Sequence, residues 1–454
     1  MQGEGGGRRG RPAALLATLR NRHFRHLWVA DMVSLLGDWA ARLALTVIVL
    51  ERTGSPAWAA GVTAVSLAGY VGLGQVLATL ADKRGRISVM LVADIVRAAM
   101  FGLMLIPGTP VGAMLVLAFV AGLATPPFEA ARSAAIPDLV PEEDYGDALA
   151  FAGISVQAAV VVGSVMGGGM LVWLGANTAL ALNAASFLVS ALIVLQLRGT
   201  PAAAPSAEGA GIGGSLRDGY RNLVDDRMVR RALVLITITG ALGTVDEALV
   251  VPYAKVVGIP DGMLGVLQAA VPIGTILVTA IIPTSGDHRR LLLGSSWCAA
   301  ITAALAAPLF FLQVGTWGAI VACLISGGMF AISIPTNVVI GTRLRRESRA
   351  SAMGIAVGVL MGSQALGAAI GGVAASVMGP PAAIGTALSL ACLFSLWAVA
   401  TNPYDAKHLA PRRRPAPAPS DEVDVIIDLT DPAPSPRPAP ATEHASTRAT
   451  PVAV

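Results

Sequence analysis

The stretch Ala78-Thr79-Leu80-Ala81-Asp82-Lys83-Arg84-Gly85-Arg86 places one acid and three bases within five residues, between two apolar runs. Residues 70–80 before these charges and residues 87–93 after them carry no charged side chain. An ionisable side chain at the centre of a bilayer costs several kcal/mol, with estimates from about 2.5 kcal/mol upward. The pattern therefore predicts a tight turn at a membrane surface that joins two membrane-spanning helices.

The composition of the whole chain agrees with a membrane protein. Of its 454 residues, 54% are hydrophobic and 13% are charged, whereas soluble domains carry about 25% charged residues. The net charge of +4 is explained by bases in loops at one membrane surface. We therefore expect the lipid bilayer as the environment of the chain and no nucleic-acid partner.

Apolar runs long enough to cross a bilayer recur along the chain. A hydrocarbon core of about 30 Å needs roughly 20 apolar residues in a helix. By this measure the sequence predicts an all-α polytopic membrane protein with twelve transmembrane helices, at 27–50, 57–80, 87–106, 111–133, 147–174, 177–197, 231–253, 262–284, 290–312, 315–341, 350–378 and 381–401.

Basic residues fix the expected orientation of these spans, because loop lysines and arginines gather on the cytoplasmic side of a membrane. One side of the predicted topology has only Arg52 and Lys255. The other side has the bases of residues 20–25, 83–86, 198–231, 289–290 and 343–349. We therefore expect a multi-pass protein of the plasma (cell inner) membrane with both termini in the cytoplasm.

A break in the middle of the chain divides the spans into six and six. It is rich in Pro, Ala and Gly and then becomes amphipathic, which predicts a flexible linker followed by a short surface helix around residues 216–221. The end of the chain is rich in Pro, Ala and Arg and cannot bury enough apolar surface to order itself. The predicted parts are a cytoplasmic N-terminal arm (1–26), an N-terminal six-helix bundle (27–198), a cytoplasmic linker (199–228), a C-terminal six-helix bundle (229–401) and a disordered cytoplasmic tail (402–454).

The two halves repeat a pattern of small residues. Gly163-Ser164-Val165-Met166-Gly167-Gly168 in the fifth span matches Gly367-Ala368-Ala369-Ile370-Gly371-Gly372 in the eleventh, which is the fifth span of the second half. Small residues at this spacing let helix backbones approach closely. The sequence therefore predicts two parallel six-helix repeats, with helix-packing positions at Gly163, Gly167, Gly168, Gly367, Gly371 and Gly372.

The loop stretch resembles the signature of the major facilitator superfamily, Gly-x-Leu-Ala-Asp-Arg-x-Gly-Arg-Arg/Lys, which joins the second and third helices in that family. Ala78 stands at the first glycine and Ile87 at the last base, while Lys83 keeps the charge of the arginine without its guanidinium fork. Two further segments, Asn21-Arg22-His23-Phe24-Arg25-His26-Leu27-Trp28 and the motif from Pro127 to Pro141, resemble the bacterial branch that includes enterobactin-type siderophore exporters.

This resemblance implies a secondary transporter that exports a small organic molecule by alternating access and is driven by protons. The family's antiporter motif, Gly-Pro-x-x-Gly-Gly, has Ser164 at its proline position here. Uptake of a nutrient through the same fold and a non-transporting receptor or scaffold stay open as alternatives. We expect a monomer whose partners are a small-molecule substrate, protons and lipid. The five histidines and three cysteines lack metal-ligand spacing, so no metal, cofactor or enzymatic site is predicted.

Charged side chains inside the spans are candidate functional residues, because each needs a partner or a water-filled cavity. Asp31, Asp38 and Arg42 lie on one face of the first span, since they are seven and four residues apart. Asp38 can be an internal ion-pair partner of Arg42, or a carboxylate that takes a proton from one side of the membrane and releases it to the other. The sequence favours the two roles equally. Asp31 lies nearer the cytoplasmic surface and is assigned to a gate.

The third and fourth spans each carry an acid and a base three residues apart. Asp94 and Arg97 form a self-contained pair whose simpler role is structural, although Arg97 can instead pair with Asp38 or bind an anionic group of a substrate. In the family's fold the fourth-span pair lies near the loop signature. The resemblance thus implies an inner gate made of Asp31, Asp82, Lys83, Arg84, Gly85, Arg86, Glu129 and Arg132.

Asp246 and Glu247 in the seventh span have no base nearby in the sequence, Lys255 being the nearest. They fit a proton or cation site, or equally a solvated pair near the outer surface. Trp39 and Tyr70 are candidates for a cavity wall, or for anchoring at the membrane interface. The predicted proton-coupling and cavity residues are Asp38, Arg42, Arg97, Asp246 and Glu247.

Overall fold

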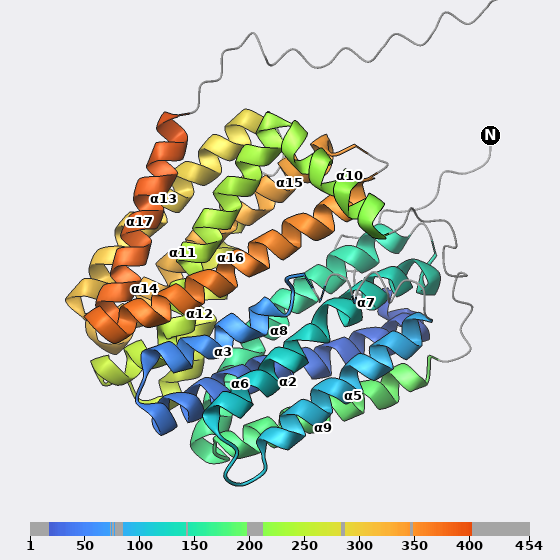
Figure 1. The fold of residues 1–454 in the computed structure, drawn as a ribbon, viewed down its shortest axis with the longest axis horizontal. Coiled ribbons are helices and arrows are strands. Elements are labelled where there is room, and N and C mark those ends of the chain that lie inside the picture. The colour runs from blue at the N-terminus through green and yellow to red at the C-terminus, as the bar shows by residue number, and fades with distance from the viewer. Residues whose placement is uncertain are drawn as a thin grey trace, which may run out of the picture. The chain divides into compact units, whose positions relative to one another are not determined.

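The computed structural model describes residues 18–72, 74, 77, 85–141, 144–197, 212–282, 287–345 and 348–401. These residues are helical nearly throughout and form no β-strand (Figure 1). The N-terminal half contains η1 (Thr18–Arg20), α2 (Arg22–Thr53), α3 (Pro56–Ala68), α5 (Arg86–Met104), α6 (Val111–Leu123), α7 (Thr125–Leu139), α8 (Tyr145–Trp173) and α9 (Ala176–Leu195). The C-terminal half contains α10 (Ile212–Asp225), α11 (Arg227–Val257), η3 (Asp261–Met263), α12 (Leu264–Ile281), α13 (His288–Leu312), α14 (Gly315–Gly327), η4 (Gly328–Ile332), α15 (Ser333–Arg343), α16 (Arg349–Met378) and α17 (Pro380–Ala400).

The prediction of a twelve-helix membrane protein is confirmed. In the described part of the chain, eleven helical segments are long and apolar enough to cross a membrane. The shorter helix α3 covers the first part of the second predicted span, and much of the rest of that span lies outside the described residues. Two spans are interrupted. The fourth divides into α6 and α7 where Pro126 and Pro127 supply no backbone N–H, and the tenth divides at η4.

The first helices of the two halves begin and end alike. Asn21 accepts hydrogen bonds from the second and third N–H groups of α2, and Asp226 does the same for α11. These side chains satisfy donors that a helix leaves unpaired at its start. α2 ends at Gly54 with φ 63° and α11 ends at Gly258 with φ 77°, a left-handed conformation that glycine adopts without steric cost. The two halves thus repeat one architecture in detail.

In both halves, glycines bring the fifth helix against the first. Gly163 and Gly167 of α8 face the backbone of α2 so closely that an added Cβ would clash. Gly367 of α16 faces the backbone of Ala241 in α11 in the same way, and Gly371 faces the Val245 side chain of α11. Figure 1 shows α16 lying between α11 and α3.

The last glycine of each set joins one half to the other. A Cβ on Gly168 of α8 would lie 2.7 Å from the backbone of Gly265 in α12. A Cβ on Gly372 of α16 would lie 3.1 Å from Cα of Ala57 in α3. The halves therefore contact each other through two equivalent crossings.

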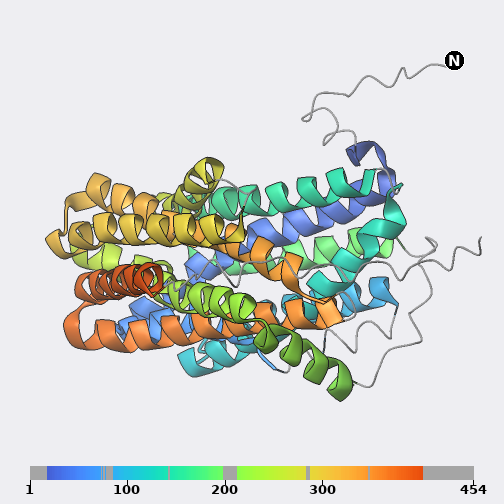
Figure 2. The same cartoon turned by 90° about the horizontal axis from the view of Figure 1, so that it is seen from above.

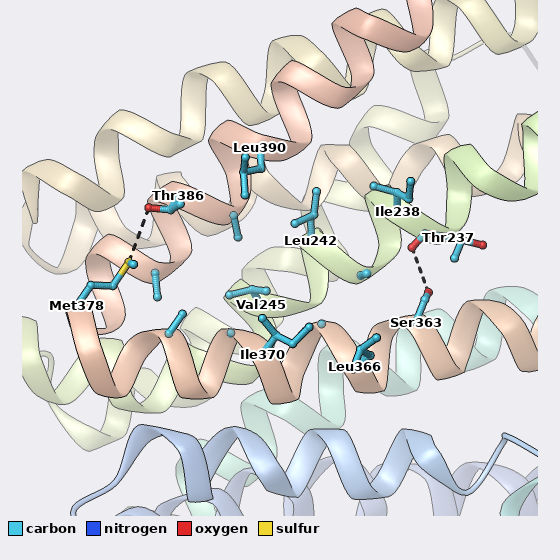
Figure 3. Close-up of a pocket in the computed structure, with 16 residues that line it drawn as sticks. Thr237, Ile238, Leu242, Val245, Ser363, Leu366, Ile370, Met378, Thr386 and Leu390 are labelled. Atoms are coloured by element: carbon cyan, nitrogen blue, oxygen red, sulfur yellow. Dashed lines mark hydrogen bonds between the residues drawn. The ribbon is translucent and has the colours of Figure 1, made fainter.

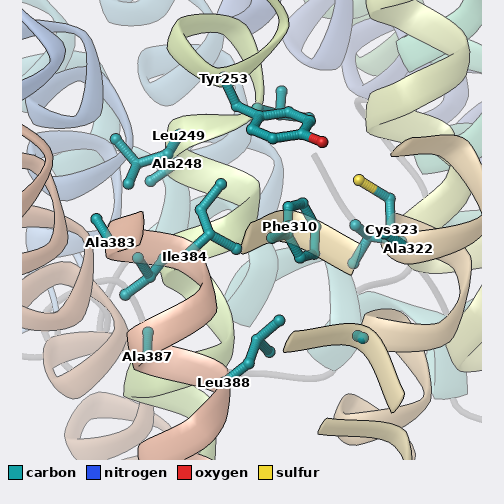
Figure 4. Close-up of a cluster of buried hydrophobic side chains, with 14 of the residues drawn as sticks. Ala248, Leu249, Tyr253, Phe310, Ala322, Cys323, Ala383, Ile384, Ala387 and Leu388 are labelled. Carbon is teal, nitrogen blue, oxygen red and sulfur yellow. The ribbon is translucent and has the colours of Figure 1, made fainter. Parts of the chain in front are cut away.

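Large side chains fill the interior of the C-terminal half (Figure 4). The rings of Tyr253 in α11 and Phe310 in α13 meet edge to face, with centroids 5.1 Å apart. Ile384 and Leu388 of α17 are 1% exposed beside them. This packing holds α11 against its own half, while its other face meets the N-terminal half.

The short helix predicted around residues 216–221 is present as α10, which begins earlier, at Ile212. It packs on the beginning of α16, as Figure 2 shows from above. The amide of Asn222 donates to Ser348 Oγ at 3.0 Å, and its oxygen accepts from the N–H of Arg345 at 3.1 Å. These contacts tie α10 to the C-terminal half.

Candidate functional site

The C-terminal half contains an apolar crevice. It has a volume of about 400 Å³ and lies between α11, α16 and α17 (Figure 3). Its walls include Ile370 and Leu390, which are 60% and 50% exposed, so it opens on the surface that faces lipid. None of its lining side chains can carry a charge. The crevice can hold an apolar chain, and it offers no ionisable side chain to a proton.

The charged residues of the first and seventh spans meet between the halves. Arg42 Nη2 lies 4.0 Å from Asp38 Oδ2, one turn earlier in α2, and Arg42 Nη1 lies 4.0 Å from Glu247 Oε1 in α11. The guanidinium also lies 4.6 Å from the centroid of the Trp39 ring. Arg42 is therefore shared by one carboxylate from each half, a contact that the sequence does not predict.

These three side chains are not sealed off by their neighbours. The exposed fraction is 32% for Asp38, 18% for Arg42 and 22% for Glu247. The ion pair between Arg42 and Glu247 directs these two side chains toward the opposite half. The accessible surface of Arg42 and Glu247 therefore borders the space between the two halves.

Asp246 is oriented differently from Glu247, although the two are neighbours in the sequence. Asp246 is 2% exposed and accepts a hydrogen bond from Ser326 of α14, inside the C-terminal half. Consecutive residues point about 100° apart around an α-helix, so only Glu247 reaches α2. The structure brings Glu247 to Asp38 and Arg42 and leaves Asp246 apart from them.

Arg97 is held by its own half. Its Nη2 lies 2.6 Å from Asp94 Oδ1, and Ser190 donates a hydrogen bond to the other carboxylate oxygen of Asp94 at 2.7 Å. The guanidinium is flanked by the rings of Phe128 and Phe187, at 4.4 and 4.5 Å. Of the two roles considered for Arg97, this geometry fits the structural one, and the pair with Asp38 is not formed.

The acid and base of the fourth span do not pair with each other. Arg132 Nη1 lies 2.5 Å from Asp31 Oδ2 in α2. Glu129 instead accepts a hydrogen bond from the Tyr70 hydroxyl at 2.9 Å. Tyr70, considered as a cavity wall, is thus a partner of the fourth span. The long arginine side chain reaches a carboxylate on another helix, which spacing along one helix cannot reveal.

Part of the predicted inner gate lies outside the described residues, namely Asp82, Lys83 and Arg84. Gly85 is the residue before α5, and Arg86 begins that helix. Arg86 pairs with Asp138 in the last turn of α7, a partner that the sequence reasoning missed. The available signal was an acid five residues beyond the end of the predicted fourth span at 133.

The sequence model of the Major Facilitator Superfamily matches residues 27–357. With twelve predicted spans, two repeated halves and charges placed between them, the chain is a multi-pass membrane transporter. It belongs to the Major Facilitator Superfamily.

Solved transporters share the fold. The nucleoside transporter NupG matches with a TM-score of 0.63 at 16% identity, over 83% of this chain and 97% of NupG. A bacterial homolog of the human lysosomal transporter Spinster, in an inward-facing and unoccupied conformation, matches with a TM-score of 0.63 at 14% identity. The match covers 87% of this chain and 96% of the homolog. A POT family transporter in complex with 5-aminolevulinic acid matches with a TM-score of 0.68 at 11% identity. The match covers 84% of this chain and 96% of that transporter. No curated protein matches the sequence.

Proposed function

We propose that this transporter exports a small organic molecule, such as a drug, siderophore or secondary metabolite, in exchange for protons by alternating access. The observation that supports coupling is the position of Arg42 between Asp38 and Glu247, which belong to different halves. The resemblance of residues 21–28 and 127–141 to enterobactin-type exporters supports the direction. The distribution of loop bases supports cytoplasmic termini in the plasma membrane, and we take the protein to be a monomer.

The shared arginine offers a simple coupling mechanism. Both of its carboxylate partners lie at 4.0 Å, which is longer than a hydrogen bond of about 2.7–3.2 Å, so the attraction is electrostatic and easily redistributed. A proton on Glu247 removes the attraction between α2 and α11 and leaves Arg42 to Asp38. Proton binding then favours the state in which these helices separate, by no more than the difference in proton affinity between the two states.

The inner gate belongs to the same proposal. Asp31–Arg132 and Arg86–Asp138 fix α2, α5 and α7 relative to one another inside the N-terminal bundle (27–198). That bundle would move as one body against the C-terminal bundle (229–401). The linker (199–228) would join the two bundles, and the arm (1–26) and tail (402–454) would stay in the cytoplasm.

The test is proton movement in proteoliposomes that contain the purified protein and an internal pH-sensitive dye. Amphipathic fluorescent compounds are added to one side, and both proton flux and compound flux are recorded. We expect flux of a compound to be accompanied by opposite proton flux in the wild type. Asp38→Asn or Glu247→Gln should abolish the proton flux. Asp225→Asn, an exposed carboxylate in α10, is the matched control and should leave both fluxes unchanged.

The alternatives give different results in the same experiment. Compound and protons moving in the same direction would support uptake by symport. Compound flux without proton movement, unchanged in both variants, would support facilitated diffusion and reduce Asp38 to a partner of Arg42. No flux of any compound would favour the receptor or scaffold.

A further inference from the structure

The charges near the space between the halves do not balance. Two guanidinium groups are each held in a close pair, Arg97 with Asp94 at 2.6 Å and Arg132 with Asp31 at 2.5 Å. Each of these pairs is neutral as a unit. In the described part of this region, Arg42 is the guanidinium that is not held in such a close pair.

Three carboxylates remain for that one guanidinium. Asp38 and Glu247 share Arg42 at 4.0 Å each. Glu129 accepts only from the neutral Tyr70 hydroxyl, and among the residues that the structure describes no base lies within 4.0 Å of its carboxylate. With all groups ionised the set carries two uncompensated negative charges, which a membrane interior strongly disfavours.

The uncompensated acids form one neighbourhood with two aromatic side chains. Tyr70 binds Glu129 and lies close enough to Asp38 and Arg42 to interact with their charges. Trp39 lies next to Asp38 and already presents its ring face to the guanidinium of Arg42. Glu129 is exposed although it lies in the first half of α7, inside the predicted fourth span. Glu129 and Asp38 therefore both have surface that a small ligand can reach.

We propose that the substrate is an organic monocation with an apolar body, such as a hydrophobic ammonium, amidinium or phosphonium ion. Its charge lies between Glu129 and Asp38, and its apolar part packs on Trp39 and Tyr70. Aromatic faces attract cations, tryptophan most strongly, and the excess of carboxylates repels an anion of the same shape. This inference rests on the proposed function, because it names the substrate class of that same site.

When no substrate is bound, the Arg42 guanidinium is the cation that lies beside Asp38 and Glu247. Its contacts at 4.0 Å are loose beside those of Arg97 and Arg132. A substrate cation that reaches Asp38 displaces part of this attraction and leaves Arg42 nearer Glu247. Substrate and proton therefore compete for the same carboxylates, so one is released when the other binds.

The test uses two probes of nearly the same shape and opposite charge, tetraphenylphosphonium and tetraphenylborate. Their binding to the purified full-length protein in detergent is measured by equilibrium dialysis. We expect the phosphonium to bind about ten-fold or more tightly than the borate, and its affinity to fall as the pH is lowered. Glu129→Gln and Asp38→Asn should each weaken phosphonium binding about ten-fold, which corresponds to about 1.4 kcal/mol.

Two controls separate binding from folding. Glu129→Asp keeps the charge and should keep phosphonium affinity within about three-fold of the wild type, and Asp225→Asn should not change it. Borate binding as tight as phosphonium binding, or unchanged phosphonium affinity in a monodisperse Glu129→Gln protein, would overturn the proposal. Phosphonium binding without proton release supports the substrate class and counts against proton coupling. Proton-coupled flux of a neutral compound without phosphonium binding supports proton coupling and counts against the substrate class.

Discussion

Arg42, Arg97 and Arg132 are three arginines of one half whose surroundings differ. Arg97 and Arg132 each hold a carboxylate at hydrogen-bond distance, and the Arg97 side chain is 8% exposed. The Arg42 side chain is about as exposed as that of Arg132, 18% against 17%, but it stands 4.0 Å from each of two carboxylates. A close, buried pair is costly to break from one side, whereas a loose one can be rearranged. We therefore propose that Arg97 stabilises the N-terminal half and that Arg42 takes part in its movement.

Asp94→Asn tests this assignment of Arg97. The substitution leaves a buried guanidinium without its counter-charge, so we expect the protein to lose about 3–5 kcal/mol of stability, seen as a lower thermal unfolding temperature in detergent. The double variant Asp94→Leu/Arg97→Met should recover most of that loss. A stable Asp94→Asn protein that has lost only transport would place Arg97 back among the cavity residues, where the sequence alone had placed it.

Arg42→Gln should behave in the opposite way. Its ion pairs are long and partly exposed, so their loss should cost only about 0–1 kcal/mol of stability. We expect nearly wild-type thermal unfolding, together with loss of substrate-evoked proton flux in proteoliposomes. A large drop in unfolding temperature would show that the contact between Arg42 and Glu247 is mainly structural.

The helices themselves were largely predictable from the sequence. Apolar length sets a spanning helix, so the predicted spans at 87–106 and 350–378 correspond to α5 and α16 with ends that differ by two residues or fewer. The break between α6 and α7 could have been read from Pro126 and Pro127. The candidate site was harder to predict from the sequence. Glu247 and Arg42 meet through the packing of two halves, and no local spacing encodes that contact.

Glycine at the crossing between the halves leads to a prediction with a close internal control. Gly168→Ala should strain the contact with Gly265, because the new Cβ would lie 2.7 Å from its backbone. At the next position, Gly169→Ala meets open space and favours the helix by about 1 kcal/mol. We expect reduced transport and a lower unfolding temperature for the first variant and neither for the second. Equal behaviour would mean that the crossing can relax.

At the scale of the whole transporter, three close contacts between the halves lie toward the same end of the spans. Gly168 meets Gly265 and Gly372 meets Ala57 there, and Lys255 lies 4.0 Å from Glu51. In the expected orientation this is the outer end. In that orientation, these three contacts join the two halves at the outer end.

A disulfide across this end should stop the cycle. A Cβ on Gly262 would lie 3.5 Å from Val172 Cγ2, so Val172→Cys with Gly262→Cys, in a protein whose three native cysteines are replaced, should cross-link under oxidation. We expect transport to stop on oxidation and to return on reduction, with the cross-link followed by non-reducing gel electrophoresis. Continued transport by the cross-linked protein would show that the outer end need not open.

The glycine crossing of α16 lies near one end of that helix, so a small tilt at the crossing displaces the far end of the helix by a much larger distance. Gly372 is 23 residues from Arg349, the first residue of α16, which is about 35 Å of helix at a rise of 1.5 Å per residue. A tilt of about 10° at the crossing would swing the far end of the helix through about 6 Å, on the same helix geometry. A rotation small enough to keep the glycine contact intact would therefore open a gap at the opposite membrane surface that is wide enough for a small molecule.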